Sequence, residues 1–301
     1  MIHLSPTTAG TLRERFIEDM TVRGFTDKTR KDYIRTVAGF AAFLERSPSS
    51  ATAEDIRRFQ IHQSERGMNA PAMNSAVAAL RFFFNHTADR PDLARKLIRL
   101  RYPRKLPTVL SPDEAARLIA ATTCLKHRAA LSVAYGAGLR VAEVAALKVG
   151  NIDSERMTIR IERGKGGRYR HALLSPNLLG MLRAWWQEGR QQGVMRPGGW
   201  LFPGQDPASS ISTRQLSRVV EAAAEAAGLT KNVSPHTLRH SFATHLLEDG
   251  VDIRVIQVLL GHAKLDNTAL YTRVATKVVR TVTSPLDKIM AQIGEGATPS
   301  G

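Results

Sequence analysis

The chain has 301 residues, which suggests about two domains, and its hydrophobic content of 43% is sufficient for buried cores. Its 43 Lys and Arg outnumber its 27 Asp and Glu, and the formal charge of +16 favours a polyanionic partner, most often nucleic acid, over a basic pI that serves only solubility. A single cysteine, Cys124, excludes an internal disulfide framework, and without a signal core or a long apolar run we expect a cytoplasmic protein with no membrane contact.

Helical patterns fill residues 11–90. The first segment starts with Thr11, carries Glu14 three residues later and stops at Gly24, which is the pattern of a capping box and a glycine stop. Three more amphipathic segments follow without a strand signal. The apolar stripes of the second and the fourth segment are Tyr33, Val37, Phe40 and Leu44, and Met73, Val77, Leu80 and Phe84. These patterns predict a small helical domain.

A basic segment follows, over residues 91–107. Prolines interrupt it at 91, 103 and 107, and no acidic residue occurs from 95 to 105. Its basic residues are Arg95, Lys96, Arg99, Arg101, Arg104 and Lys105. We predict an extended basic linker here. The overall charge favours a segment that lies along DNA phosphates over a hinge that is merely solvated.

A second domain is predicted over residues 108–290, before a disordered tail at 291–301. The stretch RMTIRIERGKGGRYRHALL alternates apolar residues, turns at glycines and returns, which predicts a β-hairpin. Helices are expected near 139–147, 176–191, 212–227, 235–248, 252–260 and 267–275, and a short one within SPLDKIMAQIGEG. The predicted fold class is therefore mainly α with a small β-hairpin or sheet (α+β).

The stretch HTLRH raises the question of a metal site, because His236 and His240 are four residues apart. A zinc protease motif needs a glutamate inside this spacing, and here Arg239 carries a charge that it cannot lose and that would repel a cation. We therefore predict no metal and no other cofactor. His240 and His245 are expected in supporting roles, His240 through a hydrogen bond behind the site and His245 as a half-buried polar residue.

The same residues are better suited to an anion. Residues 234–235 mark a helix N-terminus, where free backbone N–H groups favour negative charge, and His236 and Arg239 lie on one side of that helix. Arg140 follows a glycine turn, and Glu143, three residues later, is placed to hold a guanidinium. The alternative is that these are ordinary capping and solvated side chains.

Four segments together carry a resemblance to a known family. GAGLRVAEVAALK, RGKGGRYRH, HTLRHSFATHLLEDG and LLGHAKLDNTALYTRV, in this order and spacing, resemble the tyrosine recombinases, also called the phage integrase family. The resemblance is closest to the Xer-like and mobile-element recombinases. It covers the second domain, and the first resembles the DNA-clasping N-terminal domain of the family.

The resemblance implies a role for each matched residue. Tyr271 is the nucleophile that attacks a DNA phosphodiester, and it leaves a 3′-phosphotyrosyl link and a free 5′-hydroxyl. Arg140 and Arg239 bind the non-bridging oxygens of that phosphate. Planar guanidinium forks suit a transition state whose negative charge is spread over phosphoryl oxygens.

The remaining implied roles concern protons and support. Lys165 is the general acid for the leaving 5′ oxygen, His236 assists proton transfer, and His262 donates a hydrogen bond to the phosphate. Glu143 corresponds to the acidic residue behind the first arginine of the family. Arg168, close to Lys165, is counted with the basic linker residues as DNA-binding.

Several alternatives remain open at this stage. The resemblance implies double-stranded DNA as partner and a tetramer on two sites, with or without a second recombinase or accessory protein. A binding-only protein and a type IB topoisomerase-like nicking-closing enzyme are the rival functions. Residues 282–289 are predicted to form a helix that packs either on a neighbouring copy or on its own domain. Integration, excision, transposition and dimer resolution are not distinguished.

Overall fold

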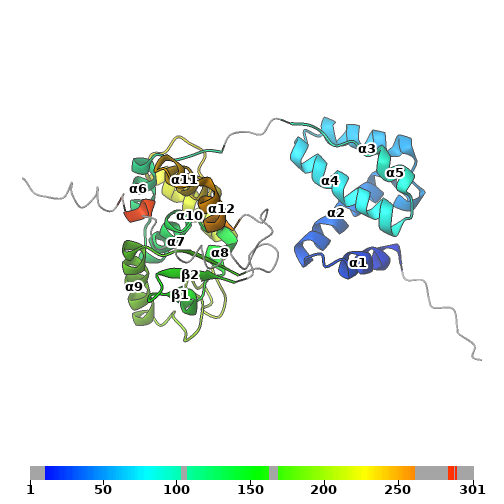
Figure 1. Ribbon diagram of the computed structural model, residues 1–301. Helices are drawn as coiled ribbons and strands as arrows, with labels where there is room; N and C mark the ends of the chain where they lie inside the picture. The colour runs from blue at the N-terminus through cyan, green and yellow to red at the C-terminus, as the bar shows by residue number, and fades with distance from the viewer. Residues whose placement is uncertain (1–10, 103–106, 163–168, 262–283, 288, 290–301) are drawn as a thin grey trace, which may run out of the picture. The chain divides into compact units, whose positions relative to one another are not determined.

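The computed structural model describes residues 11–102, 107–162, 169–261, 284–287 and 289. The chain divides into two compact units, Met1–Lys105 and Leu106–Gly301, and Figure 1 shows the elements of each. Within the described residues, no helix has the length and apolarity that a membrane crossing needs.

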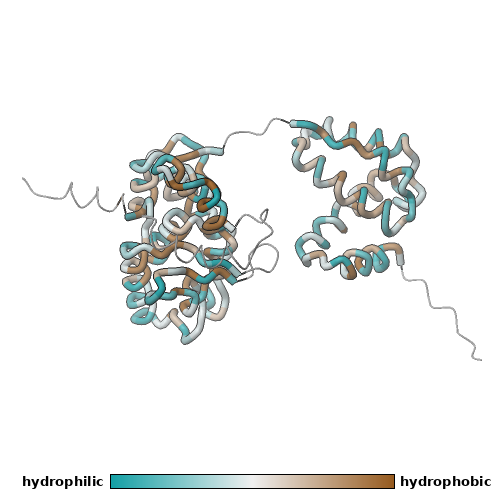
Figure 2. The backbone as a smooth tube through the Cα atoms, viewed as in Figure 1, coloured by the Kyte–Doolittle hydropathy of each residue, from teal (hydrophilic) through white to brown (hydrophobic). Residues whose placement is uncertain are grey.

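The N-terminal unit is helical, as the sequence predicted. Its elements are α1 (Leu12–Val22), α2 (Asp27–Leu44), η1 (Pro48–Ser50), α3 (Ala53–Glu65), α4 (Ala70–Phe82), η2 (Phe83–Thr87) and α5 (Pro91–Lys96). The capping box between Thr11 and Glu14 is present. Hydropathy changes along every helix in Figure 2, as amphipathic packing requires. The core is aromatic, and its fully buried side chains include Phe40, Phe83 and Phe84.

The predicted extended linker is wrong at its beginning, because residues 91–96 form α5. Pro91 occupies the first turn of this helix, where a missing N–H costs nothing. Leu93 and Ala94 are buried in the aromatic core together with Leu97. The apolar residues within the basic run therefore fix this part of the chain to the N-terminal unit.

Two side-chain amides hold the next residues in an extended conformation. The Gln60 side chain donates to the carbonyl of Ile98 over 2.8 Å and accepts from its amide over 3.2 Å. Asn74 makes the same pair of bonds with Leu100, each 2.9 Å long. Backbone groups two residues apart thus point to the same side, as along a strand edge. We call residues 97–102 the extended segment.

The C-terminal unit combines helices with one small sheet. Its elements are α6 (Pro112–Ala120), α7 (Leu125–Gly136), α8 (Val141–Ala145), η3 (Val149–Asn151), β1 (Ile152–Asp153), β2 (Thr158–Ile161), β3 (Arg170–Leu173), α9 (Pro176–Gln191), α10 (Thr213–Ala226), α11 (Pro235–Glu248) and α12 (Ile253–Leu260). The sheet is antiparallel in the order β1-β2-β3, with Ile159 opposite Ala172. The predicted α+β class and the hairpin are confirmed, whereas β1 was not predicted. The predicted helix at 267–275 lies outside the described residues.

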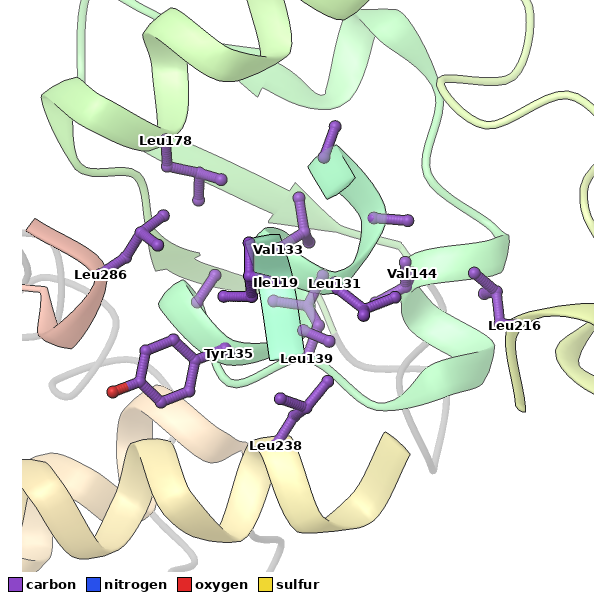
Figure 3. Packing of buried hydrophobic residues seen from close by; sticks show 14 of the residues in the cluster. Ile119, Leu131, Val133, Tyr135, Leu139, Val144, Leu178, Leu216, Leu238 and Leu286 are labelled. Carbon is purple, nitrogen blue, oxygen red and sulfur yellow. The ribbon is translucent and has the colours of Figure 1, made fainter. Parts of the chain in front are cut away.

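Helix α7 forms the centre of this unit. All its residues from Ala129 to Gly136 are buried, and it packs against α9 and α11. Figure 3 shows Leu131, Val133 and Tyr135 of this helix surrounded by leucines from other elements. A helix that is buried on every side is a rigid base for the loops and helix ends around it.

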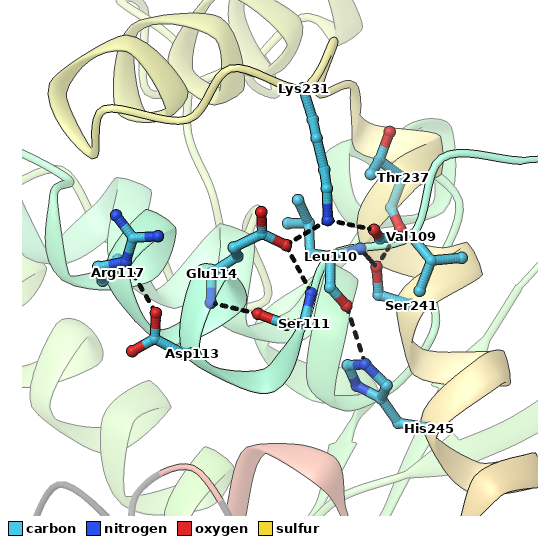
Figure 4. A network of polar contacts seen from close by, with 10 residues as sticks. All are labelled: Val109, Leu110, Ser111, Asp113, Glu114, Arg117, Lys231, Thr237, Ser241 and His245. Carbon is cyan, nitrogen blue, oxygen red and sulfur yellow. Dashed lines mark hydrogen bonds and ion pairs between the residues drawn. The ribbon is translucent and has the colours of Figure 1, made fainter.

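A buried polar network joins the start of the C-terminal unit to α11 (Figure 4). The amide of Leu110 donates to Ser241 Oγ over 2.9 Å, and His245 Nε2 donates to the Leu110 carbonyl over 2.9 Å. His245 Nδ1 therefore accepts from the Tyr135 hydroxyl, 2.9 Å away. Burial raises the pKa of Tyr135, which keeps this hydroxyl protonated. His245 is buried, with 6% of its surface exposed, and the prediction of a half-buried residue is wrong.

The described part of the C-terminal segment packs on its own unit. Leu286 and Ile289 belong to the core of the unit, and Ser284 Oγ donates to the Gly136 carbonyl over 3.1 Å. A Cβ atom at Gly136 would lie 3.1 Å from Leu286 Cβ, so this glycine makes room for the segment. The described residues of this segment thus pack within the chain, and packing of the helix on a neighbouring copy stays a prediction.

The Tyr135–His245 contact predicts a stability effect. Changing Tyr135 to Phe leaves a buried imidazole acceptor without its donor, which should cost about 1–3 kcal/mol of unfolding free energy. Urea unfolding followed by tryptophan fluorescence measures this cost for the C-terminal unit alone, because it contains every tryptophan of the chain: Trp185, Trp186 and Trp200. Tyr169→Phe, at an exposed residue, is the control and should cost little. Equal midpoints for the two variants would contradict the prediction.

The amide pairs predict a local protection pattern. In the Gln60→Ala, Asn74→Ala double variant, the backbone amides of Ile98 and Leu100 lose their acceptors and should exchange with solvent about three- to tenfold faster. Hydrogen exchange by NMR measures both amides. Arg58→Ala, at an exposed position two residues before Gln60 and therefore on the other side of α3, should leave both rates unchanged. Unchanged rates in the double variant would show that the extended segment is held by other contacts.

Candidate active site

The first part of the site is built by the short helix α8. Arg140 precedes it, and Glu143 lies in its first turn, so that the Arg140 amide donates to Glu143 Oε2 over 2.8 Å. The Arg140 guanidinium donates to Glu143 Oε1 over 2.9 Å. The turn before α8 needs Gly138, which has φ +63° and lies where a Cβ would collide with the Phe242 ring. Glu143 thus holds Arg140 as expected from the sequence.

Arg239 approaches the same carboxylate from α11. Its side chain is only 6% exposed, and its Nη1 lies 3.7 Å from Glu143 Oε2. Nη1 also donates to the Gly138 carbonyl over 2.7 Å, and Nη2 donates to the Leu260 carbonyl over 2.6 Å. Arg239 therefore ties α11 both to the turn before α8 and to the end of α12.

A third arginine, Arg170, was not singled out from the sequence. Its Nη2 donates to Glu143 Oε2 over 2.7 Å, and its Nη1 donates to the Leu259 carbonyl over 2.6 Å. Arg170 begins β3 on the same face as Ala172, which is fully buried. The sequence contained one sign of its role: Arg170 stands at a position of the strand where the alternation of apolar and polar residues predicts an apolar side chain.

Among the described residues, three guanidinium groups surround the Glu143 carboxylate, which gives an excess of about two positive charges. Burial alone would raise the pKa of Glu143, but the charge of Arg170 and the hydrogen bonds and charge of Arg140 outweigh it and hold this pKa below its usual value. Burial, together with Arg140 and Arg170, lowers the pKa of Arg239 to about 10. Glu143 and Arg239 are thus both charged at neutral pH.

Arg140 is the member of this cluster that solvent reaches most easily. Its side chain is 27% exposed, against 12% for Arg170 and 6% for Arg239. An anion at the surface would meet the Arg140 guanidinium first, with two buried positive charges behind it. The arrangement is suited to a phosphate or another oxyanion.

The histidines of HTLRH lie at the start of α11. His236 is exposed in its first turn, beside the capping bond from the Ser234 amide to Thr237 Oγ1. His240 also lies at the surface, but its side chain is partly covered. This partial burial, together with the charges of His236 and Arg239, lowers the pKa of His240. The hydrogen bond predicted for His240 is not among the contacts of the described residues. Among all the residues that the structure describes, no group of three or more His, Cys, Asp or Glu side chains is placed to hold a metal ion.

Other predicted residues belong to the N-terminal unit or lie outside the described residues. Lys165, Arg168, His262, Tyr271, Arg104 and Lys105 belong to the latter group. Gly261, with φ +64°, is the last described residue before His262. In the N-terminal unit, exposed basic residues end α5 and occupy the extended segment: Arg95, Lys96, Arg99 and Arg101.

Comparison with known proteins gives matches over both units. The phage integrase family matches residues 108–277, and the phage integrase N-terminal SAM-like domain matches residues 12–92. The protein y4qK of Sinorhizobium fredii (strain NBRC 101917 / NGR234), named as an integrase/recombinase, is 42% identical over 278 residues, which cover 92% of this chain and 88% of that protein. Tyrosine recombinase XerA of Pyrococcus horikoshii is 33% identical over 250 residues, with 83% and 86% covered.

A solved structure extends the comparison to the fold. A lambda integrase dimer bound to a COC′ core site superposes with a TM-score of 0.68 at 20% identity, covering 89% of this chain and 95% of that one. The sequence matches span more than half of this chain and include the arginine cluster. The chain therefore belongs to the phage integrase family, the tyrosine-type site-specific DNA recombinases.

Proposed function

We propose that this recombinase cuts and rejoins DNA at a specific site through Tyr271, with the three-arginine cluster as its phosphate-binding centre. The observation that supports this most directly is the excess positive charge around Glu143, presented to solvent by Arg140. A phosphodiester carries one negative charge and gains more on its phosphoryl oxygens during transfer. A preorganised cationic pocket stabilises that change without reorganising at the moment of reaction.

The proposed reaction is a transesterification. The Tyr271 oxygen attacks the phosphorus, the bond to the 5′ oxygen breaks, and a 3′-phosphotyrosyl link forms. Lys165 supplies the proton to the leaving 5′ oxygen, His236 takes up the proton that the Tyr271 hydroxyl loses, and His262 donates a hydrogen bond to the phosphate. Lys suits the acid role because, unlike Arg, it can release a proton once it is desolvated. The 3′-phosphotyrosyl link conserves the energy of the broken phosphodiester bond, so rejoining requires neither ATP nor another cofactor.

The proposed partner is double-stranded DNA. The formal charge of +16 favours it, and the exposed basic residues of α5 and the extended segment add a surface for phosphates. The solved lambda integrase structure was determined with its core-site DNA. We propose further a tetramer on two sites in the cytoplasm, formed by this chain alone or together with a second recombinase or an accessory protein.

Two rival functions remain to be tested against this one. A binding-only protein would occupy the site without forming a covalent link. A type IB topoisomerase-like enzyme would form the link and relax supercoils without exchanging strands between two duplexes. The adduct experiment below addresses the first, and a strand-exchange assay between two labelled duplexes addresses the second.

The nucleophile assignment predicts a covalent adduct. Incubation with a nicked duplex that carries the natural flanking sequence, in EDTA and without ATP, should give a denaturant-resistant protein–DNA complex. The nick lets the cut fragment leave, so the link accumulates instead of being reversed. Tyr271→Phe lacks the attacking oxygen and should give none, whereas Tyr33→Phe, in α2 and packed on Phe25 and Phe82, should react like the wild type. Gel electrophoresis and peptide mapping provide the measurement.

Each alternative result has a clear meaning. Adducts with both the wild type and Tyr271→Phe would show that another residue is the nucleophile. Tight binding of the wild type without an adduct would favour the binding-only function. An adduct that forms in a buffer with Mg²⁺ but not in the buffer with EDTA would point to a metal-dependent reaction.

The proposed DNA surface predicts a change in salt dependence. Replacing both Arg99 and Arg101 by Gln removes two phosphate contacts and should reduce the slope of log affinity against log salt by up to about 1.8. Fluorescence anisotropy over a salt series measures it. The matched control, Arg183→Gln with Arg218→Gln, removes the same charge from exposed positions of α9 and α10. Equal slopes for the two double variants would show that the extended segment does not contact phosphates.

A further inference from the structure

We propose that Arg170 is a positioning residue for strand cleavage: it fixes the Glu143 carboxylate and the end of α12, and so keeps Arg140 available to the phosphate. The proposal rests on the recombinase function proposed above. Arg170 does not need to touch DNA for this role. It acts through the two groups that its guanidinium binds.

The first step of the argument is that Arg170 joins three elements with one planar group. It begins β3, its Nη2 binds Glu143 in α8, and its Nη1 binds the last turn of α12. The two bonds are 2.7 and 2.6 Å long, and only 12% of the side chain is exposed. A guanidinium holds two acceptors at a fixed mutual angle, which the single ammonium of a lysine cannot do.

The second step concerns how the oxygens of Glu143 are divided. Oε1 accepts from the Arg140 guanidinium, whereas Oε2 accepts from Arg170 and from the Arg140 backbone amide. Because Arg170 occupies Oε2, the Arg140 guanidinium is held through one oxygen and keeps donors for an anion. Without Arg170, Glu143 could turn both oxygens toward Arg140 and compete with the phosphate for its guanidinium.

The third step concerns the end of α12. Carbonyl groups in the last turn of a helix have no partner within the helix, and here Arg170 binds that of Leu259 while Arg239 binds that of Leu260. Cations at a helix C-terminus are also favoured by the helix dipole. Gly261 follows with φ +64°, and a Cβ there would collide with the Arg170 side chain. Arg170 therefore sets where the chain leaves α12, one residue before His262.

These contacts predict a separation between binding and chemistry. Arg170→Lys keeps the charge but loses the fork, so DNA affinity should remain within about threefold, while the single-turnover cleavage rate of a nicked duplex should fall about 10- to 100-fold. The control Arg160→Gln removes an exposed arginine from the neighbouring strand β2 and should cleave at the wild-type rate. A wild-type cleavage rate in Arg170→Lys would overturn the proposal.

A double-mutant cycle tests the path of the effect. If Arg170 acts largely through Glu143, combining Arg170→Gln with Glu143→Gln should slow cleavage hardly more than the slower single variant does. Multiplicative effects of the two changes would mean that Arg170 acts independently of Glu143, and they would overturn this part of the proposal. Tryptophan fluorescence unfolding of each variant separates loss of the fold from loss of positioning.

A measurement without DNA keeps the proposal separate from the proposed function. The Arg140 amide donates to Glu143 Oε2, the oxygen that Arg170 also binds. In folded Arg170→Lys, this amide should exchange with solvent about three- to tenfold faster. If its exchange rate is unchanged, Arg170 does not fix the carboxylate, whatever the DNA assays show. If the wild type forms no adduct but this amide is released as expected, the proposed function fails while the positioning contact holds.

Discussion

The structure of the active site depends on one buried carboxylate. Glu143 is the shared partner of three arginines that come from the turn before α8, from the start of β3 and from α11. These guanidiniums would repel one another in a site largely removed from water if the carboxylate were absent. Because one negative charge cannot neutralise three positive ones, the cluster is held together and yet remains cationic. In a structural ion pair the two charges balance, whereas this cluster has more positive than negative charge, as a binding site for an anion needs.

Among the described residues, backbone carbonyls help the carboxylate to stabilise the three guanidinium groups. Arg239 and Arg170 donate to the carbonyls of Gly138, Leu259 and Leu260, which lie at a turn and a helix end and carry partial negative charge. Burial and the neighbouring guanidiniums lower the pKa of Arg239 to about 10, which still leaves it protonated at neutral pH. In the proposed function, a bound phosphate supplies further negative charge to this cationic cluster.

Much of this arrangement follows from local sequence patterns, and part of it does not. The helices, the hairpin and the Arg140–Glu143 contact were predictable because capping, alternation and a spacing of three residues are local rules. Arg170 and the polar network of His245 were missed, since both depend on contacts between residues distant in the sequence. The short helix α5 was missed for a related reason: the basic residues suggested an exposed linker, but Leu93 and Ala94 found partners in an aromatic core that only the tertiary structure creates.

Two glycines explain why the cluster can be so compact. At Gly138 the backbone passes against the ring of Phe242 with φ +63°, and at Gly261 it passes against the side chain of Arg170 with φ +64°. Both positions combine a left-handed conformation with a contact that leaves no room for a Cβ, so either constraint alone would favour glycine. The first glycine directs the chain into the turn that carries Arg140, and the second directs it out of α12 toward His262. In the motifs GAGLR and LLGH, these glycines thus set the approach of the backbone to the cluster, while the charged residues beside them provide its chemistry.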